Sequence, residues 1–514
     1  MTRPNILLIT TDQQHFSTLG AVNPKIRTPN LDRLCKMGTR FDRAYCPSPV
    51  CTPSRASILT GLYPSQHGAW TIGTHLDEAC RTLPGMLGEA GYMSGLVGKA
   101  HFHPLADTPG HTSLEKLPIV RDMEHWRGFN GPWYGFDHIE LARNHADEAM
   151  AGQHYGVWME DRGLVDWRDY FQPAPGETSA RAIPIGTNGE YWKRQARIWA
   201  LPEDFHYTRW TGERSAAFID DALAQDRPFF LWSSFHDPHP PYVLSEPWAS
   251  MYDPAEMEPG SLTPGEHDKN PPHFGKTQEE NPDFGDWHEP FEAHGCHSHL
   301  HDRDELKKDM AIYYGMVSFL DQEVGRMLDL LEARGVLDDT LIVFTTDHGH
   351  FLGQHGLMAK GPFHYEDLLR VPFIAAWPGR IAAGAVSRSL QSLVDLAPTF
   401  LEAGGLAVPH DMQGVSLLEE WTGQRAATRD FVLCENRHNP VMPHAVTHVD
   451  ARYKITVYRA GAAGELFDLE TDPNEVDNLW ANPDFATLKS ELLLRFAQSV
   501  LASERMKMPR VSHA

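Results

Sequence analysis

Four short apolar runs, each followed by polar or ionisable residues, constrain the fold of this chain most strongly. They are Asn5–Thr11, Tyr92–Gly98, Phe229–Phe235 and Leu341–Thr346. None of them alternates between apolar and polar residues, which is typical of strands that are buried on both faces of a parallel sheet. Helix-like segments separate the runs. The sequence therefore predicts an α/β fold, with a large mixed, mostly parallel sheet covered by helices on both faces.

Two of the helices can be bounded from the sequence. Thr28 and Pro29 provide an N-cap and an N1 proline for a helix that ends at Gly38. A longer helix lies within Asp304–Arg334 and is followed by Gly335, a residue that often ends helices.

The chain has 514 residues, too many for one compact core of ordinary size. We place a catalytic α/β domain at residues 1–420 and a small α+β domain at residues 421–514. Two stretches of weak periodicity, near residues 105–205 and 243–300, are rich in Trp, His, Pro and Gly. We expect them to be insertions over one end of the sheet, where active-site walls are usually built. The predicted C-terminal elements are two strands and a helix, at Phe431–Leu433, Tyr453–Tyr458 and Phe485–Ala502.

Composition argues against two classes of partner. The formal net charge is -24, whereas nucleic acids and anionic membranes require a basic protein surface. The N-terminal apolar run, Ile6–Ile9, is too short for a signal sequence or a membrane span, and no later segment reaches that length. The six cysteines are sparse and scattered, as in proteins of a reducing compartment. We therefore expect a cytoplasmic protein, and we expect it to be a homo-oligomer with neither a nucleic-acid nor a membrane partner.

Two strand ends carry the same polar sequence. ILLITTDQQH leads into Asp12 and Gln13, and LIVFTTDHGH leads into Asp347 and His348. In an open α/β sheet, ligands bind beyond the carboxyl ends of the strands. Two carboxylates, an amide oxygen and an imidazole suit a divalent cation such as Ca²⁺, Mg²⁺ or Mn²⁺. Either aspartate alone would more simply cap the following loop or helix, but the repetition favours one metal site.

The other strand ends bring cations and proton carriers to the same edge of the sheet. Lys99 and His101 follow the second run, His236 and His239 follow the third, and Lys360 lies downstream of the fourth. A lone lysine or histidine on a loop is usually solvated. Convergence of several on one edge instead indicates a site that binds an anion and moves protons.

The stretch CPSPVCTPSR contains two cysteines, Cys46 and Cys51, and ends at Arg55. The two cysteines could form a disulfide or bind zinc. The expected reducing compartment disfavours the disulfide, and the loose spacing of the cysteines disfavours the zinc site. We expect Cys51 and Thr52 to cap a helix that has Pro53 at N1. A helix N-terminus favours anions and lowers the pKa of a thiol, so Cys51 is a candidate nucleophile and Arg55 a candidate anion clamp. A thiol suits a hard metal ion poorly, however, and an oxygen nucleophile would fit better.

The sequence CTPSR at Cys51–Arg55, followed by LTGLYPSQHG, closely resembles the signature of the sulfatase family. The similarity continues through GYMSGLVGKAH, FHDPHPPY, TTDHGHFLGQHGL, LVDLAP and GELFDLETDPNEVDNLW, and so spans nearly the whole chain outside the two insertions. This resemblance implies an alkaline phosphatase-like fold and a small anionic ester as substrate. It also implies that a formylglycine-generating enzyme oxidises Cys51 to formylglycine, an aldehyde whose hydrate is the nucleophile.

The resemblance further implies the roles of individual residues. The metal ion, Ca²⁺ or Mn²⁺, is expected on Asp12, Gln13, Asp347 and His348. The expected catalytic residues are Cys51, Arg55, Lys99, His101, His239 and Lys360. Three of them, Arg55, Lys99 and Lys360, would neutralise the ester oxygens. His239, together with Lys360, would protonate the leaving group, and His101 would be the base for the second hydroxyl of the hydrate.

Two departures from the usual sulfatase pattern point in opposite directions. The pairs Asp12-Gln13 and Asp347-His348 replace the Asp-Asp and Asp-Asn of most sulfatases and resemble the phosphonate monoester hydrolase branch of the superfamily. Lys99 and His101 instead match the Lys-x-His pair of arylsulfatases. An asparagine often found after YPxxxG is replaced here, by Ile72.

We therefore expect an arylsulfatase that also hydrolyses phosphonate monoesters and phosphate diesters. The alternatives are a phosphonate monoester hydrolase or phosphodiesterase as the main activity, and a non-catalytic binding protein with the same fold. The His-rich segment His294–Glu305 offers a second metal site as one interpretation, but we favour a solvated loop that shapes the pocket or contacts another subunit.

Overall fold

The structure is a computed structural model of the whole chain. It describes all residues except 1–2, 144–150, 175, 177, 183–195, 280–281, 285–301, 438–442, 509 and 514. Most of the His294–Glu305 segment therefore lies outside the described residues, and only its last four residues are described.

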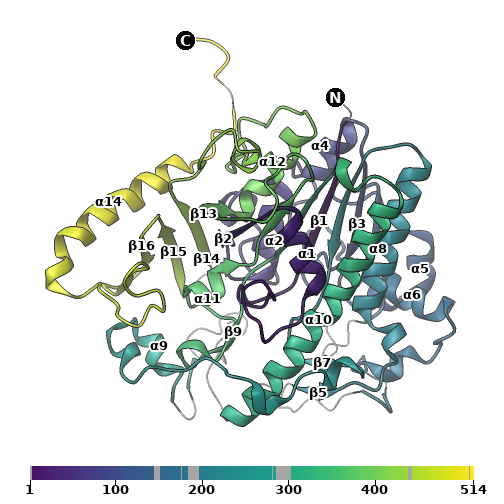
Figure 1. Cartoon of the computed structure of the whole chain (residues 1–514), viewed down its shortest axis with the longest axis horizontal. Helices are drawn as coiled ribbons and strands as arrows, with labels where there is room; N and C mark the ends of the chain where they lie inside the picture. Colours follow the sequence, from purple (N-terminus) through teal and green to yellow (C-terminus); the bar gives the residue numbers. More distant parts are fainter. Residues whose placement is uncertain are drawn as a thin grey trace.

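A mixed sheet of nine strands forms the centre of the molecule (Figure 1). Its order is β11-β2-β12-β8-β1-β6-β3-β4, with β13 also paired to β2. The five strands from β8 to β4 are parallel, whereas β12 runs antiparallel to both β8 and β2. The strands are β1 (Asn5–Thr11), β2 (Thr39–Tyr45), β3 (Met93–Gly98), β4 (His138–Leu141), β6 (Phe229–Ser234), β8 (Thr340–Thr346), β11 (Arg370–Val371), β12 (Ile374–Ala376) and β13 (Ala385–Ser392). The four predicted runs are four of the parallel strands, each within one residue of its predicted bounds.

Helices cover both faces of this sheet, as predicted. Successive residues of β1 point to opposite faces, so Ile6 and Leu8 pack into one core cluster and Leu7 and Ile9 into another. The first cluster is covered by α2 (Cys51–Thr60), α4 (Leu83–Glu89) and α12 (Leu396–Ala403). The second is covered by α1 (Pro29–Met37), α8 (Tyr207–Ala224) and α10 (Arg303–Ala333). Because both faces are buried, the strand sequences are continuously apolar and do not alternate.

The prediction that residues near 105–205 are only an insertion is wrong in one respect. This stretch contains β4, which pairs in parallel with β3 and forms one edge of the central sheet. The sequence HIEL of β4 is too short, and too polar at Glu140, to stand out as a buried strand. The stretch also contains α5 (Met123–Gly128) and α6 (Gln153–Asp161). Some of its aromatic side chains, such as Tyr155 and Trp167, form a separate core cluster with Trp210 of α8.

The remaining short elements lie mainly in loops. Within the described part of residues 243–300, the only strand is β7 and the only α-helix is α9, and both are short. The insertion near residues 243–300 stays a prediction. The short helices and strands are α3 (Pro64–His67), β5 (Arg197–Ile198), β7 (Val243–Leu244), α9 (Pro272–Lys276), β9 (Phe351–Leu352), β10 (Met358–Ala359), α11 (Glu366–Leu369) and α13 (Leu418–Trp421). No helix among the described residues is both long and apolar enough to cross a bilayer.

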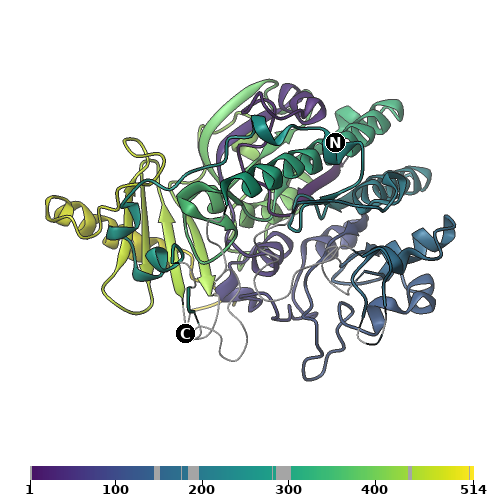
Figure 2. The same ribbon diagram turned by 90° about the horizontal axis from the view of Figure 1, so that it is seen from below.

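The end of the chain forms a second, antiparallel sheet, so the predicted C-terminal α+β unit is confirmed in kind (Figure 2). Its strands pair in chain order, and α14, which projects from the body in Figure 1, packs on them through Leu492. The elements are β14 (Val432–Arg437), β15 (His444–Val449), β16 (Tyr453–Tyr458), β17 (Gly464–Asp468) and α14 (Ala486–Ala502). The sequence predicts only β14, β16 and α14 among them, and the boundary at residue 420 stays a prediction.

This second sheet contacts the loop that precedes α2. The backbone N–H of Glu435 on β14 donates to Pro47 O at 2.7 Å. The Glu435 carboxylate accepts hydrogen bonds of 2.8 Å from both the backbone N–H and the hydroxyl of Ser65. Strand β14 therefore contacts both the loop that precedes α2 and the segment that follows it.

We predict that Gly98→Ala destabilises the protein by about 2–4 kcal/mol. Gly98 has a φ of +111°, and a Cβ there would lie 1.9 Å from Ser234 O on the neighbouring strand. Gly91→Ala is the matched control, because Gly91 has a similar φ of +91° but its nearest contact would be 3.9 Å away. The control should cost about 1 kcal/mol. Thermal unfolding of the two variants measures the difference, and equal losses would contradict the prediction.

Candidate active site

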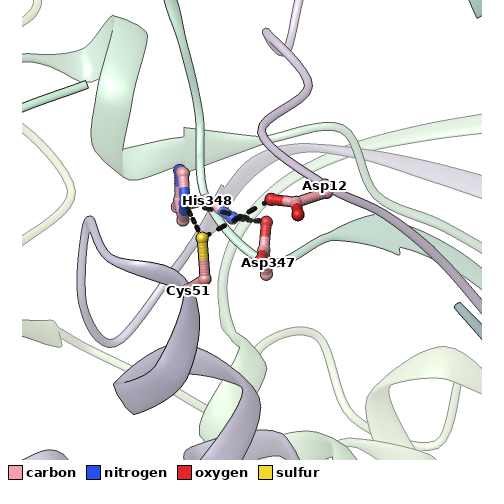
Figure 3. A group of neighbouring side chains, drawn as sticks. All are labelled: Asp12, Cys51, Asp347 and His348. Carbon is pink, nitrogen blue, oxygen red and sulfur yellow. Dashed lines mark hydrogen bonds and ion pairs between the residues drawn. The ribbon is translucent and has the colours of Figure 1, made fainter. Parts of the chain in front are cut away.

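The site lies where β1 and β8 end side by side. Thr11 pairs with Thr346 in the parallel register, so Asp12 and Asp347 leave the sheet as neighbours. Cys51, at the start of α2, faces both strand ends (Figure 3). Its Sγ lies 3.6 Å from Asp12 Oδ1 and 3.2 Å from His348 Nε2. One ligand atom each of Asp12, Cys51, Asp347 and His348 lies within 4.8 Å of the others, and all four residues are buried.

The Gln13 side chain is oriented by a chain of hydrogen bonds. Gln13 Nε2 lies 2.8 Å from His350 Nδ1, and His350 Nε2 lies 2.7 Å from Tyr242 OH. Since the amide donates to Nδ1, His350 carries its proton on Nε2 and donates it to the tyrosine oxygen. Gln13 Oε1 is left buried without a hydrogen-bond partner among the described residues. Gln13 also has a φ of 63°, in the left-handed region that non-glycine residues rarely adopt.

The His348 ring is held as a neutral ligand. Its Nδ1 lies 3.0 Å from Gly349 O and donates to that carbonyl, so Nε2 presents its lone pair to the site. Burial is the main cause that lowers the pKa of His348 to about 4. The imidazole is therefore unprotonated near neutral pH, as metal binding requires.

These residues fit a divalent cation. Asp12 and Asp347 offer carboxylate oxygens, His348 offers a nitrogen lone pair, and the buried Oε1 of Gln13 offers a neutral oxygen. A buried polar atom without a partner costs free energy unless something binds it. The predicted metal set is consistent with this geometry.

Two buried cationic side chains compensate the negative charges of Asp12 and Asp347. Lys99 Nζ forms an ion pair with Asp12 Oδ2, and Arg55 Nε donates to Asp347 Oδ2 at 2.8 Å. Arg55 Nη1 is also held by Lys99 O at 3.0 Å and by Ser234 Oγ at 2.7 Å. Arg55 Nη2 has no hydrogen-bond partner among the described residues and lies 4.0 Å from Asp12 Oδ2. Most of this guanidinium therefore fixes the site, and its Nη2 amino group, with two N–H bonds, is left for a bound anion.

Lys360 and His239 meet beside Cys51. Lys360 Nζ lies 3.0 Å from Cys51 Sγ and 3.0 Å from His239 Nε2. His239 Nδ1 lies 2.5 Å from Pro240 O and donates to it, so Nε2 accepts from the ammonium. Burial first, and Lys360 second, hold the pKa of His239 well below its usual value. Lys360 Nζ is therefore the donor of this pair and His239 Nε2 the acceptor.

His101 lies on the loop after β3 in a strained conformation, with a φ of 61°. Its Nδ1 is buried and has no hydrogen-bond partner in the described part of the chain. Burial, followed by the charges of Arg143 and Lys99, holds the pKa of His101 well below its usual value. The metal ligands and catalytic residues predicted from the sequence thus lie close together. His101 is a neutral imidazole at the edge of this group of residues.

The predicted reason for the reactivity of Cys51 is wrong. Helix α2 begins at Cys51 with Val50 as its N-cap, two residues before the predicted start at Pro53. Burial, followed by the charge of Asp12, raises the pKa of the Cys51 thiol to about 11, and these effects outweigh the helix terminus. Cys46 and Cys51 are both free thiols, so the disulfide alternative is also wrong.

Sequence reasoning did not identify several supporting residues. Ser54 Oγ donates to Asp347 O at 2.5 Å, and Ser234 holds Arg55. His350 and Tyr242 orient Gln13. Ser54, His350 and Tyr242 lie inside the quoted motifs, so their position was a usable signal. Nothing local distinguished Ser234.

Comparison with known families identifies the chain. The sulfatase family profile matches residues 4–406. The chain belongs to the sulfatase family. A second profile, the C-terminal region of N-sulphoglucosamine sulphohydrolase, matches residues 353–501. The sulfatase is therefore an enzyme of the sulfuric ester hydrolase class, as the resemblance implied.

Relatives of this sulfatase fall in both predicted branches. It is 28% identical over 489 residues to an arylsulfatase of Clostridium perfringens, covering 93% of this chain and 90% of that one. It is 29% identical over 563 residues to a multifunctional alkaline phosphatase superfamily protein of Trinickia caryophylli, covering 100% and 96%. The crystal structure of a phosphonate monoester hydrolase of Agrobacterium radiobacter superposes with a TM-score of 0.75 at 25% identity, covering 98% and 95%. The alkaline phosphatase-like fold is thereby confirmed.

We predict that His350→Ala weakens binding of a divalent cation by about 10- to 100-fold, because Gln13 loses the partner that orients its amide. Tyr242→Phe, which removes only the hydroxyl at the far end of the chain, should have a smaller effect. Isothermal titration of the metal-depleted proteins with Mn²⁺ measures both affinities. Unchanged affinity in His350→Ala would show that Gln13 does not bind the ion.

Proposed function

We propose that the protein is a formylglycine- and metal-dependent hydrolase of sulfate monoesters, an arylsulfatase that also accepts phosphonate monoesters and phosphate diesters. The observation that carries this proposal is the group of cations around Cys51. Lys360 Nζ lies 3.0 Å from Cys51 Sγ, and Lys99 and Arg55 contact the adjoining carboxylates. In a chain of formal net charge -24, attraction of an anionic ester has to come from such local cations.

The proposed cofactors are one divalent cation and formylglycine derived from Cys51. Asp12, Gln13, Asp347 and His348 would hold the cation, Ca²⁺ or Mn²⁺, which when bound supplies Lewis-acid polarisation of an ester oxygen. The aldehyde hydrate supplies an oxygen nucleophile and a second hydroxyl. An oxygen nucleophile agrees with the structure, because burial and Asp12 raise the pKa of the unmodified Cys51 thiol and keep it protonated near neutral pH.

The remaining residues bind the substrate and move protons. Arg55 Nη2, Lys99 and Lys360 would neutralise the non-bridging oxygens of the ester. We assign the proton for the leaving-group oxygen to the Lys360–His239 pair, where Nζ donates to Nε2 beside Cys51. His101 enters the reaction as a neutral imidazole, which suits a base that deprotonates the second hydroxyl.

The preference for sulfate rests on Lys99 and His101. A sulfate monoester has three non-bridging oxygens, whereas a phosphonate monoester or phosphate diester replaces one of them with an organic group. A buried ammonium and imidazole suit a third oxygen and would be poorly solvated against an apolar substituent. Lys99 is fully buried and His101 is 5% exposed, so neither has bulk water as an alternative partner.

Phosphonate monoester hydrolysis is the second candidate. It is favoured by the Asp12-Gln13 and Asp347-His348 pairs and by the similarity to the Agrobacterium radiobacter phosphonate monoester hydrolase. The maturation enzyme, the cytoplasmic location and the homo-oligomeric state stay predictions.

We predict that active protein carries formylglycine at residue 51. Mass spectrometry of the peptide that spans Ser48 to Arg55 measures the modified fraction. Cys51→Ala should abolish turnover. Cys46→Ala is the control, because Cys46 Sγ contacts the backbone of Leu368 and none of the proposed catalytic groups. Full activity in protein whose residue 51 is entirely unmodified thiol would end this proposal.

We predict a higher kcat/KM for an aryl sulfate than for an aryl phosphonate monoester or an aryl phosphate diester with the same leaving group. In the Lys99→Ala, His101→Ala double variant this preference should shrink at least about tenfold or reverse, because the third oxygen loses its partners. Steady-state kinetics with the three substrates provides the test. A wild-type enzyme that prefers phosphonate monoesters would establish the second candidate.

A further inference from the structure

A second group of potential metal ligands lies outside the catalytic quartet. One ligand atom each of His75, Glu78 and His111 lies within 4.8 Å of the other two. His75 and Glu78 belong to the segment between α3 and α4, and His111 belongs to the loop between β3 and α5. Two chain segments that are more than 30 residues apart therefore bring an imidazole, a carboxylate and a second imidazole to one point.

The two imidazoles in this group lie close together, and one of their nitrogens has no hydrogen-bond partner among the described residues. His75 Nε2 is buried and has no hydrogen-bond partner in the described part of the chain. The rings of His75 and His111 are stacked, with centroids 4.7 Å apart and an interplanar angle of 30°. No hydrogen bond between the two rings accounts for this approach among the described contacts.

A third imidazole, that of His103, lies beside this group. The backbone N–H of Leu114 donates to His103 Nδ1 at 3.1 Å, so the neutral ring carries its proton on Nε2. That nitrogen is buried and lies 3.2 Å from Glu78 Oε1, but the two atoms are not aligned as a hydrogen bond. The Glu78 carboxylate is therefore not taken up by a hydrogen bond to His103.

The segment that contains His75 and Glu78 is also hydrogen-bonded to the loop that carries Lys99 and His101. Leu76 N donates to Phe102 O at 3.0 Å, next to His101 and His103. The backbone N–H groups of Phe102 and His103 both donate to Glu115 Oε1, at 3.0 and 3.4 Å. An ion at His75, Glu78 and His111 would cross-link the two segments that flank the loop carrying Lys99 and His101.

We propose that His75, Glu78 and His111 form a second metal site, of the zinc class. Two imidazoles and one carboxylate are a ligand set of protein zinc sites that have three protein ligands and leave a fourth position for water. This donor set contains more nitrogen than the catalytic quartet, in which oxygen ligands predominate, so the two sites should differ in their metal preference. The proposal does not depend on the proposed catalytic activity.

Titration with Zn²⁺ tests the proposal on the full-length, metal-depleted protein. We expect wild-type protein to bind two equivalents, because the catalytic quartet can also take up Zn²⁺. His75→Ala and Glu78→Gln should each lose one equivalent or bind it at least about tenfold more weakly. Asp12→Ala should lose the other equivalent and keep the one at His75. His513→Ala is the matched control, because His513 is exposed and lies near the C-terminal end of the chain, far from both groups in sequence.

Thermal unfolding provides a second readout that does not rely on activity. Added Zn²⁺ should raise the midpoint of wild-type, Asp12→Ala and His513→Ala proteins, and should raise that of His75→Ala and Glu78→Gln less. Glu78→Gln preserves the size of a side chain that is 41% exposed, so it keeps the test valid if His75→Ala does not fold. One equivalent in wild type that Asp12→Ala abolishes, or equal Zn²⁺ binding by wild type and Glu78→Gln, would overturn the proposal.

Discussion

Two aspartates buried at neighbouring strand ends determine how the rest of the site is built. Asp12 and Asp347 are both fully buried, and a carboxylate without compensation in such surroundings is very costly. Arg55 from α2 compensates Asp347, and Lys99 from the end of β3 compensates Asp12. The N–H groups of Gln13 and His348 both donate to Asp347 Oδ1, at 3.0 and 2.9 Å. The cations that would bind a substrate are thus the same groups that allow the carboxylates to be buried, and neither function can be changed alone.

Much of this site could be predicted from sequence because it depends on strand ends. A strand buried on both faces is continuously apolar, and the polar residue after it marks the edge of the sheet. The repeated Thr-Thr-Asp therefore predicts that Asp12 lies beside Asp347, and the register of Thr11 with Thr346 brings the two strand ends together in this way. The helices on both faces of the sheet can be predicted as well, because two neighbouring parallel strands need a crossover connection, which is usually a helix.

What could not be predicted depends on tertiary contacts. The strand β4 has four residues, and only pairing with β3 makes it a strand. The helix start alone predicts a lowered pKa for Cys51, which is wrong because burial and the charge of Asp12 are properties of the folded site. The roles of His350 and Tyr242 require knowing that Gln13 Nε2, and not Oε1, faces away from the site. Local sequence cannot report which way an amide points.

The contact between Glu435 and Pro47 has a consequence for the order of events during protein synthesis. Cys51 is fully buried, and the loop before it is held by β14, which begins at Val432. At about 5–20 residues per second, a ribosome needs on the order of tens of seconds to pass from one to the other. Throughout that interval the nascent chain lacks β14, and for most of it the chain also lacks β8, so the thiol is accessible to any enzyme that oxidises it. Completion of the chain would then close the loop, so the time available for maturation is set by the distance along the polypeptide between a cysteine and the strand that later covers it.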